Sequence, residues 1–181
     1  MHDSAFKEAL WGFFITAAVG TALHFAYGVT GGAAILAPFV PVNESIWEHL
    51  KLLYWPTTFY TLCSLLPTGF DAHAVWARCC GLVTGLLATI ILYYTYTGVI
   101  GRGFLPVDIA LFYLSAALTY GLSYALRTRF PAPTAFEAGL FAAIILLVGM
   151  GMIFWTSSPP RIQLFRDPQA GTYGIAHLLR K

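Results

Sequence analysis

The residues of this chain best suited to chemistry lie close together in residues 43–51. This segment contains the carboxylates of Glu44 and Glu48, the imidazole of His49 and the ammonium of Lys51. The whole sequence is 58% hydrophobic and only 10% charged. Ionisable groups beside a membrane segment are costly to place, and they usually serve a function. Residues 43–51 are therefore predicted to form a polar functional site.

Helical spacing sorts these side chains onto two neighbouring faces. Residues four positions apart share a face, so Glu44 is expected beside Glu48, and Ser45 beside His49. These four residues are the candidate catalytic groups. The candidate binding residues include polar groups from the C-terminal segment and are Asn43, Glu44, Glu48, His49, Lys51, Asp167 and Tyr173.

Imidazole and carboxylate groups together also suit a divalent metal ion such as zinc, iron or manganese. The candidate metal ligands are His24, Glu48 and His49, with His24 near the end of the first apolar run. Their spacing matches neither His-Glu-x-x-His nor the Glu-x-x-His of di-iron bundles. A divalent metal is therefore the candidate cofactor, although no motif defines it.

The spacing of Ser45 and His49 is similar to the Ser-x-x-x-His of zinc-dependent membrane hydrolases related to progestin and adiponectin receptors. Those families also carry a His-x-x-x-His pair on a late helix, whereas the late part of this chain has only His177. A membrane-embedded, hydrolase-like metal enzyme is one interpretation of residues 43–51.

Two other interpretations compete with an enzyme. The leading one is the binding or transport of a small polar molecule or ion. In the other, the protein is a structural or accessory membrane subunit without chemistry of its own. Glu44 would then interact with the helix dipole, Glu48 would pair with Lys51, and His49 would be hydrogen-bonded nearby.

Five apolar runs must position these residues, near 10–27, 46–66, 79–99, 106–126 and 135–155. Each is close to the ~20 residues that a helix needs to cross a hydrocarbon layer of ~30 Å. In lipid, only a helix satisfies the backbone of such a run. The first run lacks a small-x-small cleavage site and is expected to be a retained helix. The sequence thus predicts a single all-α polytopic membrane domain over residues 1–181, a bundle of about five transmembrane helices.

The segments outside these runs are expected to fold back onto the bundle. Residues 28–42 are broken by glycine and proline but are partly apolar, so a short re-entrant or interfacial segment is expected there. Asn43 is predicted to cap the second helix. The tail, residues 156–181, contains the apolar Leu164 and Phe165 and is predicted to dock on the helices.

Helix parity indicates which segments share a side of the membrane. With five crossings, residues 28–51, the turn at 98–105 and the tail all fall on one side. Lys and Arg residues near the helix ends are divided evenly between the two sides. The pair Arg127 and Arg129 favours a cytoplasmic N-terminus. The polar site and the C-terminus are then expected outside the cytoplasm.

The expected partners follow from the same composition. A net charge of +2 is too small to indicate nucleic acid, whereas a lipid bilayer and a small polar ligand or ion are expected. Gly81 and Gly85 have a small-xxx-small spacing that allows close helix contact. Packing between helices of the same chain is the favoured interpretation, and a homo-oligomer through this face is the alternative. Cys63, Cys79 and Cys80 match no zinc or redox motif and are interpreted as structural thiols.

Three segments, in this order along the chain, resemble a bacterial membrane family, the domain-of-unknown-function family 6512. They are residues 41–51, 94–101 and 159–174. The resemblance spans nearly the whole chain, and its first and last segments are the most specific. It implies a small multi-pass protein of the bacterial inner membrane and does not imply a reaction.

Overall fold

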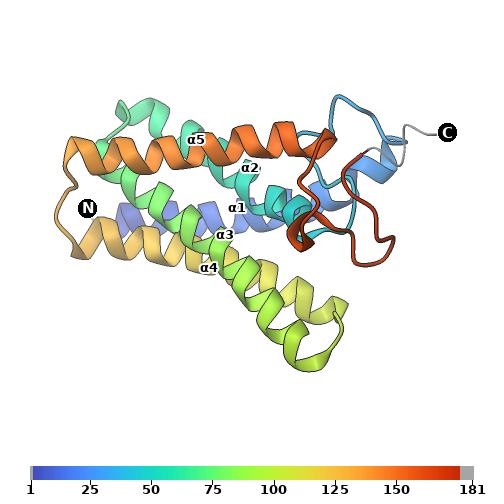
Figure 1. The fold of residues 1–181 in the computed structure, drawn as a ribbon. Coiled ribbons are helices and arrows are strands. Elements are labelled where there is room, and N and C mark those ends of the chain that lie inside the picture. The colour runs from blue at the N-terminus through green and yellow to red at the C-terminus, as the bar shows by residue number, and fades with distance from the viewer. Residues whose placement is uncertain (1, 176–181) are drawn as a thin grey trace.

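Five α-helices make up most of residues 2–175, the part of the chain that the computed structural model describes. In chain order they are α1 (His2–Val29), α2 (Ile46–Leu65), α3 (Ala72–Ile100), α4 (Leu105–Arg129) and α5 (Ala135–Ser157). Two short 3-10 turns, η1 (Leu66–Thr68) and η2 (Gln163–Phe165), complete the elements in Figure 1. The described residues form no strand beyond an isolated bridge between Arg166 and Tyr173. The predicted all-helical bundle is confirmed.

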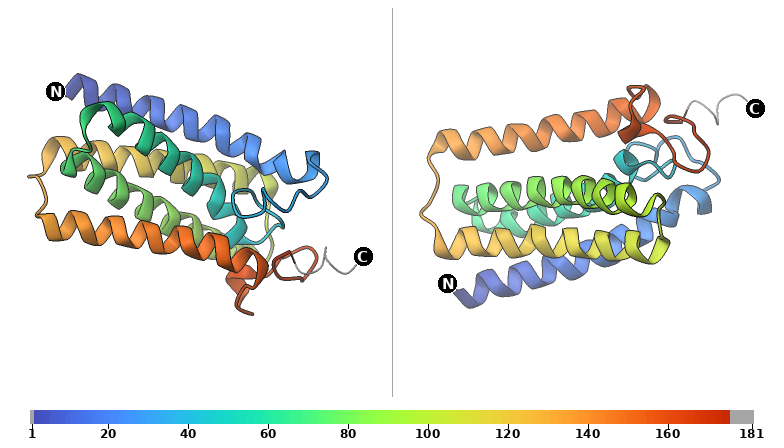
Figure 2. Two further views of the ribbon diagram at one scale, coloured as in Figure 1. Left: turned by 90° about the horizontal axis from the view of Figure 1, so that it is seen from above. Right: turned by 60° about the horizontal axis from the view of Figure 1, so that its bottom comes forward.

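Four helices in the described part of the chain, α1, α3, α4 and α5, are long and apolar enough to cross a membrane. The exception is α2, which carries Glu48 and Lys51 in its first two turns. It packs against all four other helices, and Figure 2 shows it in the middle of the bundle. Because its neighbours cover it, α2 can hold polar residues that a lipid-facing helix would not tolerate.

Some helices are longer than the apolar runs that predicted them, because capping residues extend the helix beyond the run. The helix α3 begins at Ala72 because the carboxylate of Asp71 accepts hydrogen bonds from the backbone N–H groups of His73 and Ala74. The helix ends at Ile100, and the C-cap residue that follows, Gly101, has a φ of 83°, a left-handed conformation that favours glycine. The turn that follows, residues 101–104, leads directly into α4.

The segments between the helices gather at two ends of the bundle, as Figure 2 shows. The N-terminus and the links at 66–71 and 130–134 lie at one end. The loop at 30–45, the turn at 101–104 and the C-terminal segment 158–175 lie at the other. We call this second end the site end. The arrangement agrees with the parity of five helices that run the length of the bundle.

The C-terminal segment docks at the site end, as the sequence predicts. Phe165 is 4% exposed, and its ring lies 4.8 Å from that of Trp47 and 5.5 Å from that of Trp155, centroid to centroid. Ile175 donates its backbone N–H to the carbonyl oxygen of Thr156. Burial of a phenylalanine contributes about 1.5–3 kcal/mol, so Phe165 alone is a substantial anchor.

The glycine face of α3 contacts α4 of the same chain. A Cβ atom at Gly81 would lie 2.2 Å from the backbone oxygen of Thr119, and one at Gly85 would lie 2.0 Å from the Thr119 hydroxyl oxygen. This close approach leaves no room for another helix. The interpretation of these glycines as a packing contact within the chain is confirmed, and the alternative of a homo-oligomer through Gly81 and Gly85 is corrected, because α4 occupies that face.

Candidate metal site at the end of the bundle

The start of α2 sets the positions of the candidate residues. Ser45, not Asn43, is the N-cap, and its hydroxyl accepts the N–H of Glu48 at 3.4 Å. Asn43 instead accepts the N–H of Ser45 at 2.9 Å and donates its side-chain amide to the carbonyl of Gly174 at 3.4 Å. The predicted cap was two residues early, because both residue types make good caps.

This register separates the two carboxylates that the sequence placed on one helical face. Glu44 precedes the cap and lies outside the helix, so the i, i+4 rule does not apply to it. Its side chain is 43% exposed, whereas that of Glu48 is 2% exposed. The expected pairing of Glu44 with Glu48 is therefore wrong.

Glu48 is held by a buried network and is not free to bind a metal. Its Oε2 accepts hydrogen bonds from Lys51 Nζ at 2.6 Å and from the N–H of Val42 at 3.0 Å. Lys51 Nζ also donates to the carbonyl of Ala37 at 2.8 Å and to the hydroxyl of Thr156 at 2.6 Å. These partners connect α2, the loop at 30–45 and α5, so the pair of Glu48 and Lys51 is structural. The assignment of either residue to a metal or ligand contact stays a prediction of the sequence, and neither belongs to the group of possible metal ligands that the described residues form.

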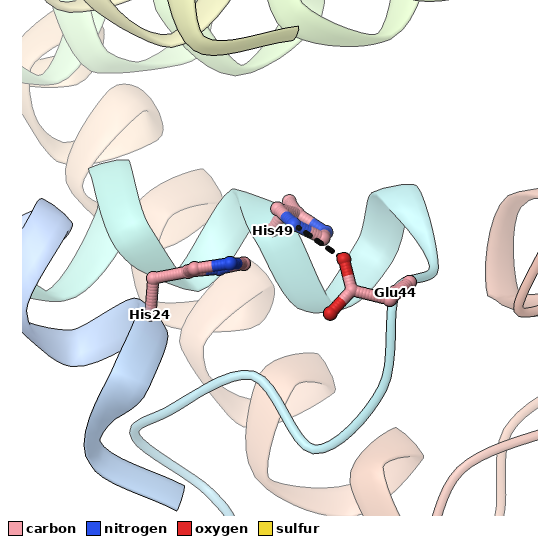
Figure 3. Close-up of side chains that lie close together, drawn as sticks. All are labelled: His24, Glu44 and His49. Carbon is pink, nitrogen blue, oxygen red and sulfur yellow. Dashed lines mark ion pairs between the residues drawn. The ribbon is translucent and has the colours of Figure 1, made fainter. Parts of the chain in front are cut away.

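Glu44 takes the place expected of Glu48, next to two histidines. Its Oε2 lies 3.5 Å from Nε2 of His49. One ligand atom each from His24, Glu44 and His49 can be chosen so that all three lie within 4.8 Å of one another. Figure 3 shows the imidazole of His24, from α1, directed at the other two side chains. The two imidazole rings lie 5.3 Å apart.

Hydrogen bonding occupies one ring nitrogen of His49 and leaves one ring nitrogen of His24 without a partner among the described residues. Nδ1 of His49 lies 2.9 Å from the carbonyl oxygen of Ser45, which can only accept a hydrogen bond. Nδ1 therefore carries a proton, and Nε2 is the ring nitrogen next to the carboxylate of Glu44. Nδ1 of His24 is buried and has no hydrogen-bond partner among the described residues. Backbone carbonyls commonly orient metal-binding histidines in this way.

A cavity of about 290 Å³ adjoins the cluster. Its wall comes from the end of α1 and from residues 41–44, and it includes His24, Tyr27, Gly28, Val42 and Glu44. Two of the three clustered side chains therefore face open space.

The C-terminal segment covers the start of α2 through Asp167. This carboxylate is 6% exposed and accepts the N–H groups of Glu44 at 3.2 Å, Gln169 at 2.7 Å and Ala170 at 3.0 Å. Asp167 therefore positions the backbone. Tyr173 is partly buried against the hydrophobic core, away from the cavity wall.

A second polar cluster, absent from the sequence interpretation, lies at the opposite end of the bundle. Glu8 accepts a hydrogen bond from Arg78 at 2.8 Å and also pairs with Arg127. The guanidinium of Arg78 lies over the ring of Tyr120, 4.8 Å from its centroid. In the sequence analysis, basic residues near the helix ends, such as these two arginines, were used only to infer the orientation of the chain in the membrane. Their shared end of the bundle was the one signal that could have paired them with Glu8.

The other candidates from the sequence lie elsewhere. Asp108, in the first turn of α4, accepts a hydrogen bond from the hydroxyl of Tyr96 beside the turn at 101–104. His177, the late histidine weighed against the membrane hydrolases, lies outside the described residues.

Comparison with known proteins places the chain in a family. No curated protein and no solved structure matches it. The model of a family of unknown function, DUF6512, matches residues 2–175, which is nearly the whole chain. This match confirms the resemblance seen in the sequence. The chain therefore belongs to the family of unknown function DUF6512.

Proposed function

We propose that this protein binds a divalent transition-metal ion through His24, Glu44 and His49. The observation that carries the proposal is the convergence of two imidazoles and one carboxylate within 4.8 Å, with Nδ1 of His24 buried and unpartnered among the described residues. A buried polar atom without a partner costs about 1–3 kcal/mol, which a bound ion would offset.

The donor set favours one class of metal. Imidazole nitrogen suits zinc, iron, copper and nickel, whereas calcium and magnesium prefer oxygen alone. Two ligand atoms at tetrahedral angles, each ~2.1 Å from zinc, lie about 3.4 Å apart. Oε2 of Glu44 and Nε2 of His49 are 3.5 Å apart. The ligand atom of His24 lies within 4.8 Å of those of Glu44 and His49, so its closer approach on metal binding would complete the site.

Binding is better supported than transport through the bundle. The ionisable side chains of α2 next to the cluster, Glu48 and Lys51, bond to each other at 2.6 Å. Both side chains are closed off from the surface, at 0% and 2% exposure. A transported ion would need ligands that change partners along its path. The parity argument, with Arg127 and Arg129, supports an extracytoplasmic site, and the bacterial inner membrane is what the family resemblance implies.

Metal analysis of the protein purified in detergent tests the proposal. After loading with Zn²⁺ and removal of excess metal, we expect one ion per chain. We expect His24→Ala, Glu44→Gln and His49→Ala each to lower zinc affinity at least tenfold. His73→Ala is the matched control, because this histidine lies at the opposite end and bonds to the carbonyl of Leu126. Equal zinc content in all four variants and the parent would contradict the proposal.

A further inference from the structure

The cluster of His24, Glu44 and His49 supplies three protein ligands, and no fourth His, Cys, Asp or Glu among the described residues joins this group. Glu48 is engaged by Lys51 at 2.6 Å. Both oxygens of Asp167 accept backbone N–H groups. Zinc sites with four protein ligands are structural, whereas sites with three leave one position for an exchangeable ligand.

The cavity gives that position a direction. Its wall includes His24 and Glu44, so a metal held by these side chains would border the cavity. The rest of the wall combines polar with apolar side chains, namely Tyr27, Asn43, Phe25, Pro41 and Val42. A volume of about 290 Å³ lies at the lower limit of small-molecule sites, which start at about 300 Å³. A ligand of only a few non-hydrogen atoms fits.

Charge selects the class of ligand. Two neutral imidazoles and one carboxylate leave a divalent ion with one net positive charge. The cavity wall contains no carboxylate besides Glu44, so it supplies no further anion to neutralise this charge. Within a protein cavity the attraction between opposite charges is stronger than in bulk water.

We infer that the metal of this site carries an exchangeable position that opens into the cavity and binds a small monoanion with an oxygen or nitrogen donor, such as a short carboxylate. The inference rests on the proposed metal binding. It identifies the cavity between the end of α1 and residues 41–44 as the ligand site of the protein.

Cobalt substitution makes the open position visible. The full chain in detergent is loaded with Co²⁺, whose visible absorption bands respond to ligand exchange, and is then titrated with azide and with acetate. We expect a saturable spectral change with both anions. A one-to-one cobalt complex whose spectrum ignores both anions would overturn the inference but leave metal binding intact. Absence of bound cobalt and zinc would instead overturn the proposed function, and the inference with it.

A variant that fills the cavity tests its location. Gly28 lies in α1 and lines the cavity, and a Cβ atom added there would have no other atom within 4 Å. The side chain of Gly28→Leu would therefore start in open space, and the cobalt content of the variant checks that His24, Glu44 and His49 still bind the metal. We expect this variant to bind cobalt as the parent does and to bind azide at least tenfold more weakly. Gly98→Leu in α3 is the matched control, since Gly98 is also helical with open space around it. Unchanged azide affinity in Gly28→Leu would overturn the assignment to this cavity.

Discussion

The ammonium of Lys51 lies 2.6 Å from the carboxylate of Glu48, and both side chains are shut off from the surface, at 0% and 2% exposure. Lys51 also donates to Ala37 in the loop at 30–45 and to Thr156 at the end of α5. One side chain thus joins three segments at the site end. Glu48 and Lys51, the charged residues next to His49 in the sequence, therefore stabilise the segments that hold the candidate metal site.

Removal of one partner of this pair should be far more harmful than removal of both. Lys51→Met leaves the carboxylate of Glu48 buried without its counter-charge, and we expect a loss of roughly 3–5 kcal/mol in the free energy of unfolding. The double variant Lys51→Met/Glu48→Gln removes both charges and should recover part of that loss. Thermal unfolding in detergent, followed by circular dichroism, measures both.

Lys7→Met, at an exposed position in α1, is the control for loss of a lysine. It should unfold at the temperature of the parent protein. An equal loss in the single and the double variant would show that the charge of Glu48 is not buried as the structure has it.

Contact between α3 and α4 should depend on the absence of a side chain at Gly81. In Gly81→Ala the new methyl would meet the backbone oxygen of Thr119 at 2.2 Å, so the two helices must move apart. Overpacking of this kind costs about 1–3 kcal/mol. Gly121→Ala in α4 is the matched control, because its methyl would meet no atom within 4 Å. Thermal unfolding should separate the two variants, and similar stability would contradict the close contact.

The positions of the helices and the end of the bundle that holds the site could both be predicted from the sequence. The first depends on the length of the apolar runs, and the second depends on the number of helices. The sequence was not sufficient for the ligand set. Asn43 and Ser45 are both good caps, and a shift of two residues decides whether Glu44 is in the helix with Glu48 or outside it beside His49. The approach of His24 depends on how α1 packs on α2, which no local pattern encodes.

The second polar cluster illustrates the same limit. Glu8, Arg78 and Arg127 belong to three different helices, and each looks like an ordinary charge near a helix end. Their pairing becomes apparent only when tertiary packing brings the helix ends together.

Reporter fusions should reveal the topology that the five helices imply. Truncations fused after Asp71 and after Arg129 should report the cytoplasm, because Arg127 and Arg129 favour that side. Fusions after Gly101 and at the end of the chain should report the opposite side. If the reporters at Asp71 and Gly101 agree with each other, α3 does not cross the membrane. If all four reporters are inverted, the site end faces the cytoplasm.

The tail should loosen when Asp167 can no longer accept hydrogen bonds. In Asp167→Ala, the N–H groups of Glu44, Gln169 and Ala170 lose their acceptor. Each hydrogen bond to a charged group contributes about 1.5–3 kcal/mol. Because 1.4 kcal/mol corresponds to a factor of ten, we expect tryptic cleavage after the exposed Arg161 to accelerate at least tenfold.

Gln169→Ala keeps the backbone N–H that Asp167 accepts and is the matched control for this experiment. Its cleavage rate should equal that of the parent protein. Asp167→Ala should also weaken zinc binding, because the backbone of Glu44 is then less firmly held beside His49. A variant with faster cleavage but parental zinc affinity would separate tail docking from the metal site. Unchanged cleavage would mean that the packing of Phe165 on Trp47 is enough to hold the tail.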